Sequence, residues 1–215
     1  MRHAFLAFTN PVEGREAEFN AWYDDVHLEE VVQYGTGMTG GRRFRSSALR
    51  GPGIARAPWS YLAWYDLEHP DLAEYHRQPW AVDGPALKPF EGIVADDHAA
   101  WIYAPCGKRI GRPADGGREA SGGCVRLFVF SGRGMTELAA SLPGFVAGRQ
   151  YEAAAQQRGR QSPPPRHLAV YEVEAGDAAK AAVIASTGAA PGSGSDDHVV
   201  WLFEPLGHFL ERTSR

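Results

Sequence analysis

Short apolar blocks recur along the chain and are separated by polar or glycine-rich stretches. In residues 61–68 and 167–174, Leu, Ala, Val, Tyr and Trp alternate with polar positions or run on over several residues. Side chains on a strand alternate between two faces, and β-branched and aromatic residues pack well there. These blocks therefore predict β-strands.

A stretch of the chain with helical periodicity lies between the first two predicted strands. Residues 16–33 carry apolar side chains, Phe19 and Trp22 among them, at three- and four-residue steps, which predicts an amphipathic helix. A second helix is predicted over residues 70–78, because Pro79 interrupts the pattern. Shorter helices are predicted in the second part of the chain, over residues 136–142 and 177–186.

The strand blocks form an ordered internal repeat. Residues 96–107 recur as 196–207, an offset of 100 positions, with Asp-Asp-His, Trp, Pro and Gly identical. Three further segments match in the same order, at offsets of 106, 107 and 122: 61–68 with 167–174, 41–44 with 148–151, and 6–8 with 128–130. Four matches in one order indicate a duplication.

Each half then reads β-α-β-β-α-β, the ferredoxin-like order of an α+β protein. We expect two tandem repeats packed sheet to sheet, with cavities between sheet and helices, as an intrachain dimeric α+β barrel. The expected boundaries are a first repeat over 1–106, a glycine-rich linker over 107–123, a second repeat over 124–207 and a tail over 208–215.

Composition narrows the class of protein. The formal charge is −4 and the pI about 6.1, whereas nucleic-acid-binding domains usually have a pI above ~9. No apolar run approaches the ~20 residues of a membrane span, and the N-terminal apolar core is too short for a signal peptide. We expect a cytoplasmic protein that binds neither nucleic acid nor membrane, with Cys106 and Cys124 reduced.

The two halves differ at the first helix. Phe8 and Phe44 lie 36 positions apart, but the equivalent Phe130 and Tyr151 only 21. The missing stretch corresponds to residues 18–30, which carry most of the polar and aromatic side chains of that helix. Either this helix holds a functional site present in one half only, or the second copy lost the segment by neutral divergence.

Within this helix, Tyr23 and His27 lie at i and i+4 and share a face with Asn20. Imidazole can accept and return a proton near neutral pH, and a phenol can donate to an oxyanion or enolate. Asp24, three residues before His27, would raise the pKa of His27 or fix its tautomer. We predict His27, Tyr23 and Asp24 as catalytic residues; the alternative is a packing helix in which His27 caps a carbonyl.

Other side chains are predicted to bind the substrate around this group. His76 and Trp80 belong to the second helix region, and Arg42 and Arg43, on a strand, offer a clamp for a carboxylate or phenolate. The predicted substrate-binding residues are Asn20, Trp22, His76, Trp80 and Arg43. His98 and His198 occur in both repeats, which favours a structural role at the strand start.

The segment Trp-Tyr-Asp-Asp-Val-His, residues 22–27, following Asn10-Pro11 and Phe19, resembles the motif of EthD-like proteins in the dimeric α+β-barrel superfamily. Members often carry a Pro two residues after the His, where this chain has Glu29. The resemblance implies a range of activities: cofactor-free oxygenation of aromatic polyketides, cyclisation, dehydration, decarboxylation, lactone isomerisation, and haem binding or degradation. It defines the fold more closely than the reaction.

We therefore expect a cofactor-independent enzyme, of cyclase, dehydratase, decarboxylase or isomerase type, acting on an aromatic or polyketide-like small molecule. The sequence has no H-E-x-x-H, no phosphate-binding loop and no G-x-G-x-x-G after a strand, so no metal and no cofactor is predicted. A binding protein for such a molecule and a haem-binding oxygenase remain alternatives, since one axial His suffices for haem. A homodimer is also compatible with this fold.

Overall fold

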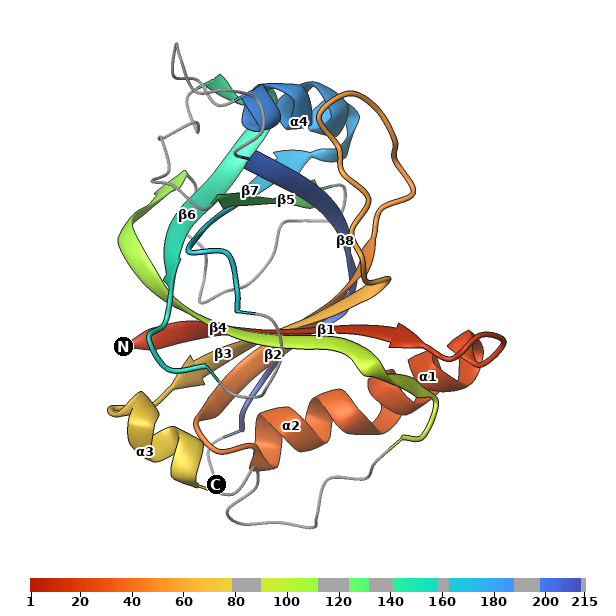
Figure 1. Ribbon diagram of the computed structural model, residues 1–215, viewed down its shortest axis with the longest axis vertical. Coiled ribbons are helices and arrows are strands. Elements are labelled where there is room, and N and C mark those ends of the chain that lie inside the picture. The colour runs from red at the N-terminus through yellow and green to blue at the C-terminus, as the bar shows by residue number, and fades with distance from the viewer. Residues whose placement is uncertain (79–89, 112–123, 132–140, 158–162, 188–197, 214–215) are drawn as a thin grey trace.

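Eight antiparallel strands close into one barrel in the computed structural model, which describes residues 1–78, 90–111, 124–131, 141–157, 163–187 and 198–213 (Figure 1). Alternating or continuous apolar residues form these strands, as the pattern predicts. They are β1 (Arg2–Pro11), β2 (Met38–Ser46), β3 (Tyr61–Glu68), β4 (Ile93–Gly111), β5 (Cys124–Ser131), β6 (Phe145–Ala153), β7 (His167–Glu174) and β8 (His198–Glu211).

The strand order around the barrel is β1-β3-β2-β8-β5-β7-β6-β4, and β4 returns to β1. The first half contributes β4-β1-β3-β2 and the second half β8-β5-β7-β6, so the internal repeat is visible in the order of the strands. Two seams join the halves: β2 pairs with β8, and β4 pairs with β6.

The prediction of two ferredoxin-like α+β repeats packed sheet to sheet is wrong. The halves are joined edge to edge by strand pairing, for example Arg43 opposite Leu206 and Cys106 opposite Gln150, and the chain is mostly sheet with few helices. The physical reason is strand length. β4 has 19 residues and β8 has 14, so each extends beyond its own half and pairs with the other, which leaves no open edge.

The long strands also occupy part of the predicted connecting segments. β4 continues through Gly111, inside the proposed linker 107–123, whose remaining positions lie outside the described residues. β8 continues through Glu211, inside the proposed tail. Cys106 and Cys124 are not joined by a disulfide bond.

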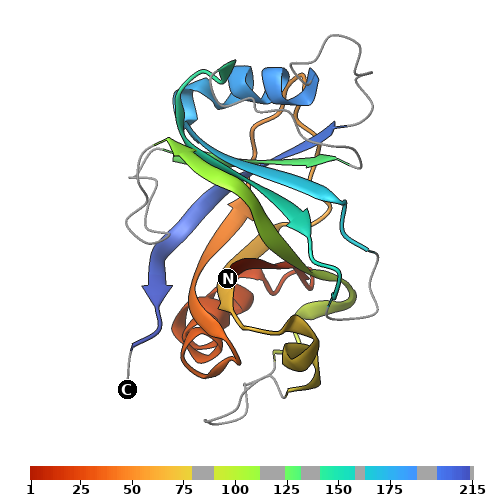
Figure 2. The same ribbon diagram turned by 90° about the vertical axis from the view of Figure 1, so that its left-hand side faces the viewer.

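Helices cover the barrel on opposite sides (Figures 1 and 2). The predicted helix over 16–33 is present, but it consists of α1 (Glu16–Trp22), a π-helical turn η1 (Tyr23–His27) and α2 (Leu28–Tyr34). The others are α3 (Leu72–Arg77), the 3₁₀ turn η3 (Ala175–Asp177) and α4 (Ala178–Thr187). Most of the helix predicted over 136–142 lies outside the described residues. No helix in the described ranges is long and apolar enough to cross a membrane.

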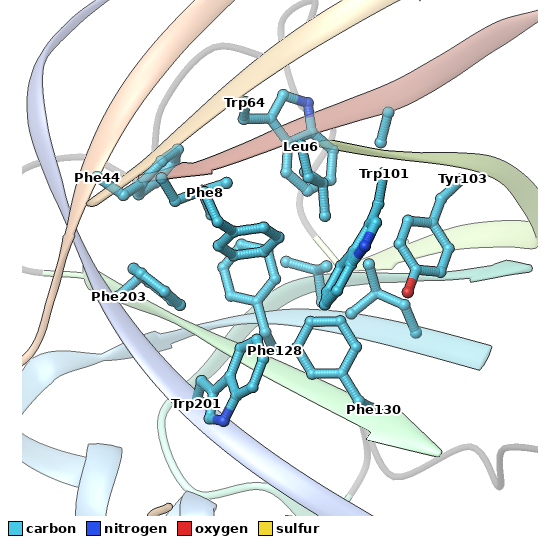
Figure 3. Packing of buried hydrophobic residues seen from close by; sticks show 14 of the residues in the cluster. Leu6, Phe8, Phe44, Trp64, Trp101, Tyr103, Phe128, Phe130, Trp201 and Phe203 are labelled. Atoms are coloured by element: carbon cyan, nitrogen blue, oxygen red, sulfur yellow. The ribbon is translucent and has the colours of Figure 1, made fainter. Parts of the chain in front are cut away.

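The barrel interior is filled largely by aromatic side chains from both halves (Figure 3). Phe8 has ring centroids of Trp59, Trp101 and Trp201 at 5.1, 5.0 and 5.9 Å. Burying one such side chain contributes roughly 1.5–3 kcal/mol. Trp64 and Trp101 belong to this shared core, and Trp59 packs against it.

Candidate functional site

The segment that carries the predicted catalytic residues lies on the outer wall of the first half, between the helices α1–η1–α2 and the barrel strands (Figure 1). Phe19 and Tyr23 pack there against Phe5 of β1 and Tyr65 of β3. In η1, the N–H of Leu28 donates to the carbonyl of Tyr23, five residues earlier. A π-helical turn inserts an extra residue into the helix and re-aims its side chains, and such turns are frequent at functional sites.

A buried arginine organises this wall. Arg43 of β2 is 1% exposed and lies under the helix. Its Nη1 contacts Asp24 Oδ1 at 2.5 Å, and its Nη2 donates to Asn20 Oδ1 at 2.6 Å. The guanidinium carbon also lies 4.4 Å from the ring centroid of Tyr23. Two charge-assisted contacts and a cation–π contact fix the guanidinium at the base of η1.

The polar contacts continue to β3. Asn20 Nδ2 donates to the Tyr61 hydroxyl at 2.9 Å, and that hydroxyl donates to Glu16 Oε1 at 2.6 Å. Asn20 therefore holds Arg43 and Tyr61 in place, and both polar atoms of its amide are used within the protein. The contacts that the structure gives Asn20 are with Arg43 and Tyr61.

His27 is packed between aromatic rings. Its imidazole stacks on the indole of Trp22, with centroids 4.2 Å apart and planes at 19°, and meets the Tyr23 ring edge-on at 4.9 Å. His27 Nδ1 is buried, and no described residue offers it a hydrogen bond. Burial, with a smaller contribution from the nearby Arg43 charge, lowers the pKa of His27 to about 4. The ring is therefore neutral at pH 7.

Asp24 does not act on His27 as predicted. Its carboxylate pairs with Arg43, and the pKa of His27 is lowered, not raised. The reason is a competing cation: Arg43 of β2 forms an ion pair with the Asp24 carboxylate. The Asp24 side chain is 57% exposed. Asp24 thus helps to hold Arg43.

The hydroxyl of Tyr23 points into the protein. It lies 3.3 Å from the hydroxyl of Tyr65, and Tyr23 is only 3% exposed. Burial raises the pKa of the Tyr23 phenol, so the group stays protonated at neutral pH. Its ring forms the wall beside His27, while its hydroxyl belongs to an internal pair.

The remaining predicted binding residues are dispersed. Trp22 is next to His27 and also stacks on Phe90, with centroids 5.2 Å apart. His76 lies on α3, where its ring contacts Tyr75 rather than the His27 group. Trp80 lies outside the described residues. The structure therefore brings together Asn20, Trp22, Tyr23, Asp24, His27 and Arg43.

The outer wall of the second half is built differently. There α4 packs small side chains against the sheet: Ala178, Ala181, Ala182 and Ala185. At the position equivalent to Arg43, offset by 107, the chain has Gln150. Within the described residues, the cationic, aromatic wall belongs to the first half.

A cavity of about 250 Å³ lies elsewhere, inside the barrel, and none of the predicted site residues lines it. Of its charged lining, sequence reasoning considered Arg42 but missed the others. A signal was available for Arg126, which alternates with Phe128 and Phe130 on β5 and so shares their inward face. In the described part of the chain, no three His, Cys, Asp or Glu side chains are grouped so as to hold a metal ion.

The sequence matches no protein-family model and no curated protein. Among solved structures, an anthrone oxidase-like protein matches with a TM-score of 0.55 and 13% identity, over 99% of this chain and 94% of that one. A candidate monooxygenase from Lactobacillus acidophilus NCFM matches with a TM-score of 0.45 and 10% identity, over 95% and 93% of the two chains. The first likeness shows a common fold over nearly the whole length, and the fold alone.

Proposed function

We propose that the chain is a cofactor-independent enzyme that removes a proton from an aromatic or polyketide-like small molecule, with His27 as the base. One observation carries this proposal: a neutral imidazole, with a buried Nδ1 that no described residue satisfies, is held between Trp22 and Tyr23. His3 and His76 also have a buried nitrogen without such a partner, but His27 combines it with stacking on Trp22 and a neighbouring buried arginine.

Arg43 supports the formation of an anion beside His27. Its charge acts on the imidazole and helps to lower the pKa of His27. The same charge favours an enolate or phenolate forming next to the ring, because it is fixed in place before the reaction. As negative charge develops on the substrate, it raises the basicity of His27 and so assists the proton transfer.

The proposed substrate class rests on the aromatic wall and on two likenesses. The Trp22–His27 segment resembles the EthD-like motif, and the solved structure with the same fold is described as anthrone oxidase-like. Proton loss from an anthrone gives a carbanion that dioxygen can oxidise, yielding the quinone and water. The same first step would serve an isomerase, dehydratase, decarboxylase or cyclase.

Anthrone and dioxygen provide the test. Oxygen uptake and quinone absorbance above the uncatalysed rate are measured for the protein, for His27→Ala and for His208→Ala, which replaces an exposed histidine. Loss of a positioned base should reduce turnover about 10²–10⁴-fold in His27→Ala and leave the control unchanged. Equal rates for the two variants would refute the role of His27. Quenching of tryptophan fluorescence by anthrone without turnover would favour the binding-protein alternative.

A further inference from the structure

The cavity inside the barrel begins where the aromatic core ends. On β1, Arg2 and Ala4 line it, whereas Leu6 and Phe8 belong to the packed core. Its apolar lining includes Trp64 and Tyr151, whose rings meet edge-on with centroids 5.6 Å apart. The lining also includes His3 and seven charged side chains, five arginines and two carboxylates: Arg2, Arg42, Arg109, Arg126, Arg149, Asp66 and Glu172.

The two carboxylates are occupied within the protein. Glu172 accepts hydrogen bonds from Arg126 at 2.8 and 3.1 Å and lies 3.6 Å from Arg109. Asp66 accepts from the indole N–H of Trp64 at 3.1 Å and lies 3.5 Å from Arg2. The lining thus has three more arginines than carboxylates, although Arg2 also pairs with Glu68 at 2.7 Å, outside the lining.

Among the arginines of the lining, Arg149 most clearly lacks a partner for its charge. Its side chain makes no hydrogen bond or ion pair with the described residues, and its Nε is buried. Its charge nevertheless acts on the Tyr151 hydroxyl, together with the charges of Arg126 and Arg109. A buried guanidinium nitrogen without a partner costs stability unless a ligand or water satisfies it.

Both halves supply equivalent charges. Arg42 and Arg149 are related by the offset of 107 positions, and Asp66 and Glu172 by the offset of 106. All four line the cavity, so the repeat places an arginine and a carboxylate from each half around one space. The outer wall, by contrast, has Arg43 in one half and Gln150 in the other.

We propose that this cavity is a second ligand site, which binds a small aromatic carboxylate. Arginine matches a carboxylate in charge and in the geometry of its paired donors. The Trp64 and Tyr151 rings supply the apolar surface for the body of the ligand, and burial raises the pKa of Tyr151 to about 12, so its hydroxyl remains a neutral donor. A volume of about 250 Å³ is below the ~300–1,000 Å³ of drug-sized sites, which favours a single ring.

The exposure of the lining side chains indicates where a ligand would enter the cavity. The side chain of Arg2 is 47% exposed and that of Arg109 33%, whereas Arg126 and Glu172 are 12% and 7% exposed. The ligand therefore enters past Arg2 and Arg109, with its carboxylate directed to Arg149. The proposal is independent of the proposed function, because His27 lies on the other side of the barrel wall.

The test is calorimetric titration of the full chain with benzoate, benzamide and inorganic phosphate. Benzoate should bind in the millimolar range or more tightly. Benzamide, which lacks the charge, and phosphate, which lacks the ring, should each bind at least about tenfold more weakly. Arg149→Gln should weaken benzoate about tenfold. Arg56→Gln, on the exposed loop between β2 and β3, and His27→Ala should leave it unchanged.

Arg149→Gln breaks no ion pair among the described residues, so it should fold, and thermal melting followed by circular dichroism checks this. Arg42→Gln provides a second variant in the same wall, with the same expected loss. Equal binding of benzoate and benzamide would overturn charge recognition, and equal binding of phosphate would overturn the aromatic site. Unchanged benzoate affinity in both folded arginine variants would refute the assignment of the benzoate site to this cavity.

Discussion

Arg42 and Arg43 are neighbours in β2, yet their guanidinium groups lie on opposite sides of the barrel wall. Arg43 contacts Asp24 under the helix, whereas Arg42 lines the interior cavity and donates to the Gly207 carbonyl at 2.8 Å. Successive side chains on a strand point to opposite faces, so one dipeptide serves both the outer wall and the interior.

Replacing Arg43 should loosen the outer wall. Arg43→Met removes the contacts with Asp24 and Asn20, and we expect a loss of about 2–3 kcal/mol in the free energy of unfolding. The cost stays below that of breaking a fully buried pair, because Asp24 can be hydrated. Urea denaturation measures it. Arg45→Met removes an exposed pair with Glu204 and should cost less than about 1 kcal/mol; equal losses would contradict the structural role of Arg43.

The pKa of His27 can be measured without a substrate. Nuclear magnetic resonance titration should give about 4, well below the ordinary 6.5, because burial disfavours the charged ring. Between these values the unfolded chain binds a proton that the folded chain does not, so stability should fall as the pH falls from 6.5 to 4. The amount is on the order of 3 kcal/mol.

His27→Gln should lose this contribution to the pH dependence while keeping a planar polar group. Unfolding free energies of the two proteins, compared across the same pH window, provide the check. A His27 resonance that titrates near 6.5 would show that the ring is solvated.

The Tyr23–Tyr65 pair should appear as a coupling between two hydroxyls. Tyr23→Phe leaves the buried Tyr65 hydroxyl without this partner, and we expect a loss of about 1–2 kcal/mol. Tyr65→Phe should cost a similar amount, and the double variant clearly less than the sum of the two. Strict additivity in the unfolding free energies would mean that the hydroxyls do not interact.

Glu172 and Asp66 occupy equivalent positions in the two halves, but replacing each carboxylate by its amide should change the free energy of unfolding by different amounts. Glu172→Gln weakens the two hydrogen bonds from Arg126 and should cost about 2–3 kcal/mol. Burial raises the pKa of Asp66, so its charge is already unfavourable, and Asp66→Asn keeps an acceptor for Trp64. We expect a change within about 1 kcal/mol for Asp66→Asn. Thermal or urea unfolding at neutral pH distinguishes the two; similar losses would argue against this assignment.

The local elements could be predicted from sequence, because strand and helix periods are local properties. The strands around Tyr61 and His167 and the helix after Asp177 lie where the pattern places them. Barrel closure could not be predicted in this way. It depends on pairing between residues such as Phe44 and Pro205, which lie far apart in the sequence and whose local patterns do not specify their partners.

For the candidate site, the helical pattern placed Asn20, Tyr23 and His27 on one face, but it did not give the contacts of this segment with other strands. Asp24 is close to His27 along the helix, and a helical pattern alone cannot show that Arg43 from another strand takes its carboxylate. For the cavity, the repeat aligns Arg42 with Arg149, and alternation along both strands places the two side chains on the same inward face.

Barrel closure also has a consequence for assembly. Every strand is paired on both sides, so either half alone would expose two unpaired strand edges and an aromatic inner face that includes Trp101 or Trp201. Such a half would require a second half to complete it, at a rate that depends on concentration. Covalent linkage replaces that encounter with an intramolecular one at high effective concentration, so the barrel forms equally well in dilute solution.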